Sequence, residues 1–349
     1  MSADLYFLPH VARMAGYVPG EQPRDAGIIK LNTNENPYPP SPRVLEAITR
    51  GLDDRLRLYP DPLGTAFRRV AADLHGVDPD MILAGNGSDD LLTILTRSFV
   101  GPGDVLAYPS PSYILYRTLA EIQGARWVEV PFDETWSLSP EAFAEARPRL
   151  AFVANPNSPS GTVLGVSDLA RIAEAVDCPL VVDEAYVNFA DSDAVSLVKS
   201  HKNVIVSRTF SKGYSLAGLR LGYLIAQPDM VLGMIKVKDS YNCDTLSLIG
   251  GTAALLDQDY QATTRAKILA TRVRLTSAMR GFGYVVPDSH ANFVWCTGGP
   301  PTAPTYEALK ARKILVRLMR YPGLPDGLRI TVGTDAEVDR FLDALGSII

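Results

Sequence analysis

Cysteine, histidine and net positive charge are all scarce in this chain of 349 residues, which has three cysteines and four histidines. The cysteines, Cys178, Cys243 and Cys296, are odd in number and far apart, so they predict neither a disulfide framework nor a paired metal motif. The histidines have no metal-ligand spacing, and we expect no metal site. These features favour a reducing cytoplasm as the location of the protein.

The charge and hydropathy patterns argue against two classes of partner. The net charge of −5 does not provide the basic face that nucleic acid selects. No stretch reaches the roughly 20 apolar residues of a membrane span. The first residues, MSADLYFLPH, lack the basic and apolar regions of a signal peptide. We therefore expect small-molecule partners and no nucleic acid or membrane.

Short apolar runs alternate with helical patterns from about residue 43 to residue 242. The runs are DVLAY, ARWVEV, RLAFVAN, PLVVDEAY, NVIVSRT and LGYLIA. This alternation predicts an α/β sheet flanked by helices. PLVV and NVIVS are rich in β-branched residues with little polar alternation, which is typical of buried central strands.

The two ends of the chain differ from this pattern. Residues 1–42 are rich in Pro and Asn without a sustained period, and they predict an extended arm. A charged helical pattern at 259–281 is followed by ANFVWC, a helix over TYEALKAR, the strands KILVR and LRITVG, and a terminal helix. This order predicts a small α+β domain. We divide the chain into an arm at 1–42, a large domain at 43–245 and a small domain at 246–349.

The central signal is RTFSKGYSLAGLRLGY, residues 208–223, just after the run NVIVS. Lys212 there follows the carboxyl end of a predicted strand, where open α/β sheets bind ligands. A lone lysine would be read as a surface residue, but Ser211 and Arg220 add a hydroxyl and a planar cation suited to a phosphate. Beside that cation, and shielded from water, Lys212 should lose its proton more easily, as imine formation requires.

An acid ends the preceding apolar run. Asp183 is either a helix cap or solvated loop acid, or a carboxylate that keeps a pyridine nitrogen protonated. In the second interpretation the ring draws electrons from a substrate carbanion, and Tyr186 donates to the ring's phenolic oxygen. Lys212 and Asp183 together therefore indicate pyridoxal-5′-phosphate (PLP) chemistry.

Two further segments also follow predicted strands. AGNGSDDLLTILTRSF predicts a Gly-rich turn into a helix with Ser88 as its cap, and the free N–H groups of such a helix start suit a phosphate. Capping alone also explains Ser88 and Asp89. Tyr113 either lays its ring against a flat cofactor or is a core tyrosine. A P-loop is excluded because no Gly-Lys-Ser/Thr follows.

The remaining signals are a loop and two cations. NPNSPSG, residues 155–161, predicts a tight loop that presents an amide to the cofactor. Arg317 in KILVR and Arg329 in LRITVG lie on predicted strands, where an unpaired arginine is unfavourable. Two such cations suit a substrate with a carboxylate or phosphate, because the guanidinium fork binds these oxyanions in bidentate fashion.

Taken together, these blocks resemble the fold-type I aminotransferases, and most closely the histidinol-phosphate aminotransferase family. The blocks are YVPG, LNTNENP, YPDP, GNGSDDLL, PSYILY, NPNSPSG, VVDEAY, RTFSKGYSLAGLRLGY and LRITVGT. The resemblance spans essentially the whole chain. It implies a large mixed-sheet α/β/α domain, a smaller α+β domain, PLP as cofactor, and a homodimer with shared active sites.

The resemblance also implies a role for each candidate residue. Lys212 would form a Schiff base with PLP and later move a proton, Asp183 would pair with the pyridinium, and Tyr186 would bond the phenolic oxygen. The other assignments are Tyr113 stacking on the ring; Ser211, Arg220, Gly87, Ser88 and Asp89 at the phosphate; Tyr59 reaching the phosphate from the neighbouring subunit; and Tyr17, Asn36, Arg317 and Arg329 at the substrate.

The cofactor loop departs from the family pattern. Many relatives read NPNNPTG, whereas this chain has Ser158 and Ser160 at the second Asn and the Thr. We therefore assign the phenolic-oxygen contact to Asn157, with a neighbour or water as the alternative.

The function that the resemblance implies is transamination between L-histidinol phosphate and 2-oxoglutarate, giving imidazole acetol phosphate and L-glutamate, in histidine biosynthesis. The alternatives are an aromatic amino-acid aminotransferase and a PLP-dependent lyase such as a phosphothreonine decarboxylase. These reactions differ in which bond stands perpendicular to the ring, which depends on where the two arginines hold the anion. A non-catalytic PLP module of a regulator is disfavoured by the intact Lys212 and Asp183 and by the absence of a helix-turn-helix region.

Overall fold

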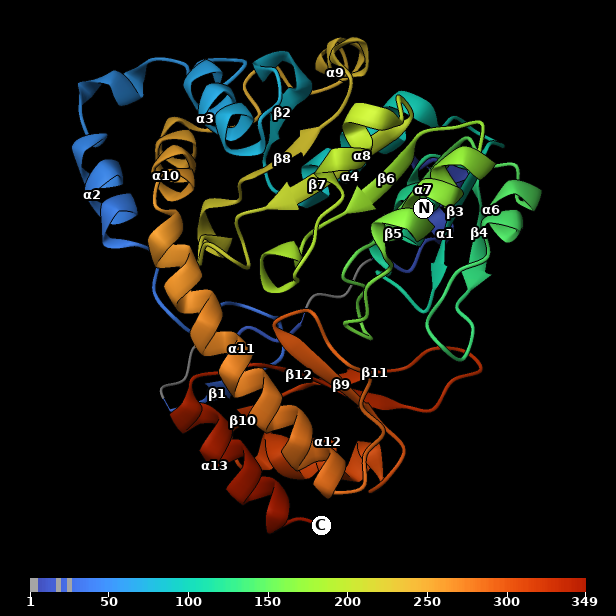
Figure 1. Cartoon of the computed structure of the whole chain (residues 1–349), viewed down its shortest axis with the longest axis vertical. Helices are drawn as coiled ribbons and strands as arrows, with labels where there is room; N and C mark the ends of the chain where they lie inside the picture. Colours follow the sequence, from blue (N-terminus) through green and yellow to red (C-terminus); the bar gives the residue numbers. More distant parts are fainter. Residues whose placement is uncertain (1–5, 17–19, 24–26) are drawn as a thin grey trace.

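The computed structural model describes residues 6–16, 20–23 and 27–349, and it has a large upper part and a smaller lower part (Figure 1). The long helix α11 (Gln258–Gly281) runs from the upper part into the lower one. None of the helices formed by the described residues combines the length and apolar character needed to cross a membrane.

A seven-stranded mixed sheet forms the centre of the large part. Its strand order is β2-β8-β7-β6-β5-β3-β4. The strands are β2 (Ile82–Gly85), β3 (Val105–Ser110), β4 (Arg126–Pro131), β5 (Leu150–Ala154), β6 (Leu180–Asp183), β7 (Val204–Thr209) and β8 (Gly222–Ile225). Strands β3 to β7 pair in parallel, whereas β8 is antiparallel to both β7 and β2. The predicted α/β fold with a large mixed sheet is confirmed.

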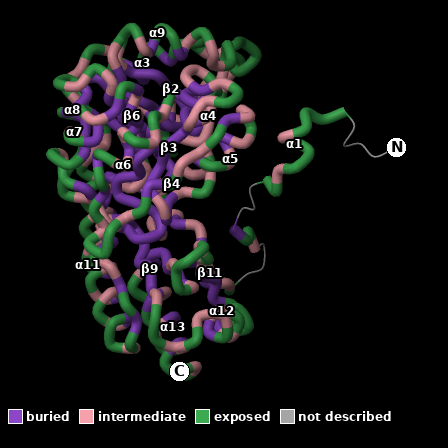
Figure 2. The backbone as a smooth tube through the Cα atoms, turned by 90° about the vertical axis from the view of Figure 1, so that its right-hand side faces the viewer, coloured by how far each residue is buried: buried purple, intermediate pink, exposed green. Residues whose placement is uncertain are grey.

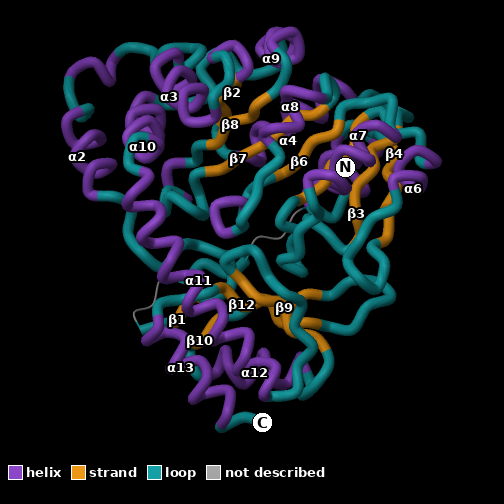
Figure 3. The backbone as a smooth tube through the Cα atoms, in the orientation of Figure 1, coloured by secondary structure: helices purple, strands orange, loops and turns teal. Residues whose placement is uncertain are grey.

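Helices cover both faces of this sheet (Figure 3). Alternate residues of a strand point to opposite faces, so Val181 packs on one side while Val182 packs on the other. The side of Val181 carries α4 (Ser88–Phe99), α5 (Leu115–Ile122) and α9 (Pro228–Ile235). The side of Val182 carries α2 (Pro42–Arg50), α3 (Thr65–His75), α6 (Pro140–Glu145), α7 (Val166–Ala175), α8 (Val195–Ser200) and α10 (Thr245–Leu255).

The smaller part has its own sheet and core. Strands β11 (Arg317–Met319), β12 (Gly327–Thr331) and β9 (Phe293–Thr297) form an antiparallel sheet in that order. Its apolar side packs with α11, α12 (Thr302–Ala311) and α13 (Asp335–Gly346). Buried backbone therefore runs through the middle of both parts, and exposed segments lie outside it (Figure 2).

The N-terminal arm is part of the small domain's structure, which the sequence did not indicate. The arm residues of β1 (Ile29–Lys30) pair in parallel with β10 (Ile314–Leu315), and Ile29 and Leu31 belong to the small core. The stretch KILVR is not one strand, because β10 pairs with β1 while β11 joins the three-stranded sheet. At the other end of the arm, α1 (Pro9–Arg13) lies near α5, where the His10 ring bonds the Ile122 carbonyl. The domain boundaries at residues 42 and 245 stay a prediction.

Candidate active site

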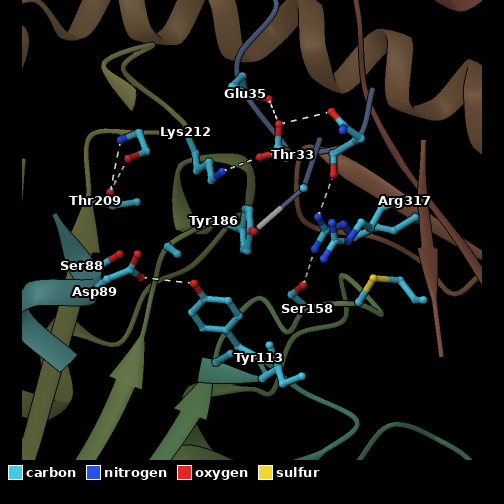
Figure 4. A pocket seen from close by; sticks show the side chains of 18 of the residues that line it. Thr33, Glu35, Ser88, Asp89, Tyr113, Ser158, Tyr186, Thr209, Lys212 and Arg317 are labelled. Carbon is cyan, nitrogen blue, oxygen red and sulfur yellow. Dashed lines mark hydrogen bonds between the residues drawn. The ribbon is translucent and has the colours of Figure 1, made fainter. Parts of the chain in front are cut away.

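A cavity of about 780 Å³ lies between the carboxyl ends of the parallel strands and the small sheet. Most of the predicted residues line it, although they come from segments far apart in the sequence (Figure 4). They are Ser88, Asp89, Tyr113, Asp183, Tyr186, Ser211, Lys212, Arg220, Arg317 and Arg329. The strand order explains this gathering, since β2, β6, β5, β3 and β7 all end at this edge.

Lys212 reaches into the cavity from the turn after β7. Its Nζ donates a hydrogen bond to the Thr33 carbonyl at 2.9 Å. Burial lowers the pKa of Lys212 to about 8, and Arg329 acts in the same direction while Glu35 opposes it. The sequence pointed to Arg220 as the neighbouring cation, but Arg220 contacts Ser211 and Asp89 instead. The amine is thus closer to its neutral, nucleophilic form than an exposed lysine.

Asp183 ends β6 and is only 4% exposed. Its Oδ2 accepts a 2.8 Å hydrogen bond from the Tyr116 hydroxyl, and its Oδ1 accepts one from the Ala185 N–H. Burial raises the pKa of Asp183 to about 6, while the bond from Tyr116 acts against that rise. The helix-cap and solvated-acid interpretations do not fit a buried side chain, and a cationic ring nitrogen is the partner that such a carboxylate suits.

One corner of the cavity is built like a phosphate site. The Arg220 guanidinium contacts the Ser211 hydroxyl at 3.3 Å and lies 3.6 Å from Asp89. Gly87 has φ +86°, and a Cβ there would stand 2.6 Å from Arg220 Nη2. A Cβ on Gly222 would similarly stand 2.9 Å from the Ser88 nitrogen. These glycines keep the start of α4 close to Arg220, so backbone N–H groups, a hydroxyl and a cation converge as a phosphate requires.

The prediction that Ser88 caps α4 is wrong. The N-cap is Gly87, no side chain caps the helix, and Ser88 is the first helical residue. The reason is the backbone of Gly87, whose φ of +86° is open to glycine and closed to most other residues. The Ser88 side chain therefore does not cap the helix, and Ser88 lines the cavity.

Two tyrosines flank the space between the lysine and the acid. Tyr113 donates to Asp89 at 3.3 Å, and Tyr186 accepts from the Asn34 amide at 3.0 Å. Both rings are held by edge-on aromatic contacts, Tyr113 by Tyr116 and Tyr186 by Phe293. Tyr113 lines the cavity, as the cofactor-facing interpretation expected, and it also packs against the core.

The two predicted arginines stand side by side on the small sheet. Arg317 and Arg329 are direct register partners on β11 and β12. Arg329 donates to the Ser158 hydroxyl and the Asn32 carbonyl, both at 3.1 Å. Its buried Nε has no partner, and no carboxylate of the described residues lies within ion-pair range of it. Such a cation fits an anionic ligand.

Asn157 does not line the cavity. Its amide nitrogen donates to the Pro111 carbonyl and to Ser160 Oγ, and its oxygen accepts from Ser112. The amide is thus occupied in holding the loop, and Ser158 is the residue of this loop whose hydroxyl faces Arg329. The geometry favours the alternative in which the phenolic oxygen meets a neighbour or water.

Two other predicted residues, Asn36 and Tyr59, lie away from the cavity lining. Asn36 donates to the Lys212 carbonyl and accepts from the Tyr38 N–H, so its side chain supports the lysine turn. Tyr59 is 80% exposed and stacks on Tyr241 at 4.4 Å. Tyr17 lies outside the described residues.

The structure also places residues in the site that the sequence did not single out. The arm contributes Thr33 and Glu35, and the small domain contributes Leu318, Met319, Arg320 and Tyr321. Thr33 and Glu35 belong to the block LNTNENP, and its polar residues, which carry part of the family resemblance, were the signal that could have identified them. The others follow Arg317 directly, but nothing in the sequence showed that β11 lines the cavity.

Comparisons with known proteins agree with this geometry. Residues 26–345 match the family model described as "Aminotransferase class I and II". The chain belongs to this family. It is 49% identical to a histidinol-phosphate aminotransferase of Rhodopirellula baltica, over 96% of this chain and 93% of the relative. It is 46% identical to histidinol-phosphate aminotransferase 1 of a Nostoc species, over 99% and 98%.

Solved structures show the same fold. Histidinol-phosphate aminotransferase of Sinorhizobium meliloti, in complex with pyridoxal-5′-phosphate, superposes with a TM-score of 0.90 at 28% identity, covering 98% of this chain and 97% of that one. Aspartate aminotransferase of Thermus thermophilus has a TM-score of 0.80 at 20% identity, over 92% of both chains, and supports the fold alone. The predicted fold-type I architecture, the aminotransferase activity and the resemblance to the histidinol-phosphate aminotransferases are confirmed.

Proposed function

We propose that this enzyme transfers the amino group of L-histidinol phosphate to 2-oxoglutarate, as a step of histidine biosynthesis. The observation that carries the proposal is the pair Arg317 and Arg329 at the wall of the cavity, next to apolar and aromatic residues. The pair suits the phosphate of the donor and a carboxylate of the acceptor in turn. The neighbouring side chains that suit an imidazole ring are Ile114, Leu318, Met319 and Tyr321. The names of the relatives point to the same reaction.

The cofactor is PLP, whose ring, when bound, withdraws electrons from the substrate's α-carbon. The residues of the cavity fit it: an amine of lowered pKa, a buried carboxylate, and a corner of N–H groups with a hydroxyl and a guanidinium. Lys212 would hold PLP through its amine and, once released by the substrate, would accept and return the proton of the substrate's α-carbon. Asp183 would keep the ring nitrogen protonated, and Tyr186 would donate to the phenolic oxygen.

The surrounding residues position the two partners. Arg220, Ser211 and the first turn of α4 would hold the cofactor's phosphate, and Tyr113 would pack against the ring. Arg329 fixes the substrate anion, and Ser158 helps to orient the guanidinium through the 3.1 Å bond. Where the anion is held determines which bond at the α-carbon stands perpendicular to the ring, and this orientation distinguishes transamination from decarboxylation.

The active unit in this proposal is a homodimer. Tyr59 stacks on Tyr241 at the surface and does not line the cavity of its own chain. Large apolar side chains are exposed in the same segment, as at a surface that is covered in the assembly. They are Leu45, Leu52, Leu56, Leu58 and Leu63. Tyr59 is thereby available to the phosphate corner of a second copy. The three buried, free cysteines fit a cytoplasmic location.

A panel of amino donors tests the substrate assignment. Each donor is mixed with the PLP-loaded enzyme without an acceptor, and conversion of the bound cofactor to its amino form is followed by absorbance. We expect histidinol phosphate to give fast and complete conversion. Conversion by phenylalanine or tyrosine but not by histidinol phosphate would replace the proposal with an aromatic aminotransferase. Release of carbon dioxide from phosphothreonine would replace it with a lyase.

A further inference from the structure

A second tyrosine of the block PSYILY lies beneath the cavity. Tyr116 is fully buried on α5 and does not line the cavity, yet its hydroxyl donates to Asp183 Oδ2 at 2.8 Å. Tyr113, three residues earlier, faces the cavity. The hydroxyls of the two tyrosines thus bond different carboxylates of one site, Tyr113 that of Asp89 and Tyr116 that of Asp183.

Packing fixes where the Tyr116 hydroxyl stands. Phe152 stacks on the ring at a centroid distance of 4.8 Å and an interplanar angle of 14°. Tyr113 meets it edge-on at 5.7 Å, and Tyr108 is tilted against it at 5.9 Å. A ring enclosed in this way in a close-packed core has little freedom to turn its oxygen elsewhere. The hydrogen bond from this fixed hydroxyl therefore restrains the position of Asp183 Oδ2 on the side away from the cavity.

Asp183 depends on these donors. The described residues place no cation within ion-pair range of its carboxylate, and its bonds come from the Tyr116 hydroxyl and the Ala185 N–H. Burial favours the neutral acid, whereas hydrogen bonds donated to the carboxylate favour the charged form. Tyr116 is the side chain that supplies such a bond.

We propose that Tyr116 is a positioning residue that holds the Asp183 carboxylate ionised and oriented toward the ring nitrogen of the cofactor. This inference rests on the proposed function, since it assumes that PLP is the partner of Asp183. Tyr116 touches neither substrate nor cofactor and acts through the acid alone.

The test is PLP binding by the full-length chain as a function of pH, in the parent and in Tyr116→Phe. PLP affinity should fall toward acid as Asp183 takes up a proton. Without the hydroxyl, Asp183 keeps its proton to higher pH, so this acid limb should move upward in Tyr116→Phe. At neutral pH the affinity for PLP should drop about tenfold, the usual weight of a hydrogen bond to a charged group.

Two comparisons make the result specific. Tyr108 is a buried neighbour whose hydroxyl bonds Glu129 at 3.1 Å instead of Asp183, so the acid limb of Tyr108→Phe should coincide with that of the parent. Asp183→Asn should remove the limb. Adding Tyr116→Phe to Asp183→Asn should then change PLP affinity no further, because the tyrosine has no charged acid to support.

The fall in PLP affinity toward acid pH could be the same in Tyr116→Phe as in the parent and absent in Asp183→Asn. That result would overturn the role of Tyr116 and leave the proposed function standing. An equal shift in Tyr108→Phe would also overturn it, by assigning the effect to packing. A parent chain that binds no PLP at any pH would instead defeat the proposed function itself.

Discussion

Arg317 and Arg329 face each other as register partners on β11 and β12, and both line the same cavity. Like charges in directly opposed positions of an antiparallel pair are unfavourable. An anion bound between the two guanidinium groups removes that cost, and Arg329 carries a buried Nε without a partner. The cavity wall formed by the small sheet thus suits an anionic ligand.

Replacing Arg329 with lysine should impair catalysis without removing the cofactor. The ammonium keeps the charge but loses the planar fork that binds an oxyanion through two bonds. We expect kcat/KM for the amino donor to fall about 100-fold, the equivalent of about 3 kcal/mol of lost binding. The absorbance of bound PLP should be unchanged. Arg312→Lys, on the surface after α12, is the control and should match the parent.

Covalent capture of PLP by the protein should follow the titration of Lys212. The neutral amine attacks and the ammonium does not, so the capture rate should rise with pH and reach half of its maximum near pH 8, where the lowered pKa lies. Stopped-flow absorbance at a series of pH values measures this rate. A midpoint near the ordinary lysine pKa of roughly 10.4 would contradict the burial argument. Lys212→Ala should show no covalent capture at all.

Removal of the Asp183 side chain should reduce turnover far more than it reduces the binding of PLP. In Asp183→Ala the lysine and the phosphate corner still hold PLP, although more weakly, while the ring nitrogen loses its anion and with it the proton. We expect kcat to fall about 1,000-fold or more, since loss of a buried charge partner costs several kcal/mol. Single-turnover kinetics at saturating PLP measure the effect, and a rate near that of the parent would refute the role of Asp183.

Gly87→Ala should weaken phosphate binding because its new side chain would clash with Arg220. Gly103→Ala separates this clash from backbone strain. The new Cβ would stand 2.6 Å from Arg220 Nη2 and would impose a strained φ of +86°. Gly103 has φ +84° with nothing within 4 Å of a Cβ, so Gly103→Ala carries the strain without the clash. Both variants should lose roughly 1–3 kcal/mol of stability. Isothermal titration should show reduced PLP affinity in Gly87→Ala alone.

Complementation tests whether the sites span two subunits. Tyr59→Ala and Lys212→Ala chains are each expected to be defective as homodimers. Refolded together they form mixed dimers, and one of the two sites then holds both an intact Tyr59 and an intact Lys212. Partial recovery of activity, up to about one quarter of the parent value for random mixing and one good site per mixed dimer, is expected. Mixtures without any recovery would place each site within a single chain.

Short-range sequence patterns are sufficient to predict part of this fold. Buried strands such as PLVV and NVIVS reveal themselves by continuous β-branched runs, and polar residues that end such strands mark the site edge. The sequence therefore predicts Lys212, Asp183 and Arg220 at one edge of the sheet, and they line the same cavity, because parallel strands bring their carboxyl ends together whatever lies between them.

Other features depend on tertiary packing: which side chains already have hydrogen-bond partners, and which residues lie behind the site. Asn157 and Ser158 are adjacent and both polar, yet the packing of the loop on Ser112 satisfies one and turns the other toward Arg329. The division of KILVR between two sheets and the bond from Tyr116 to Asp183 likewise join segments far apart in sequence. Contacts of this kind depend on the packing of elements against one another, which no local pattern encodes.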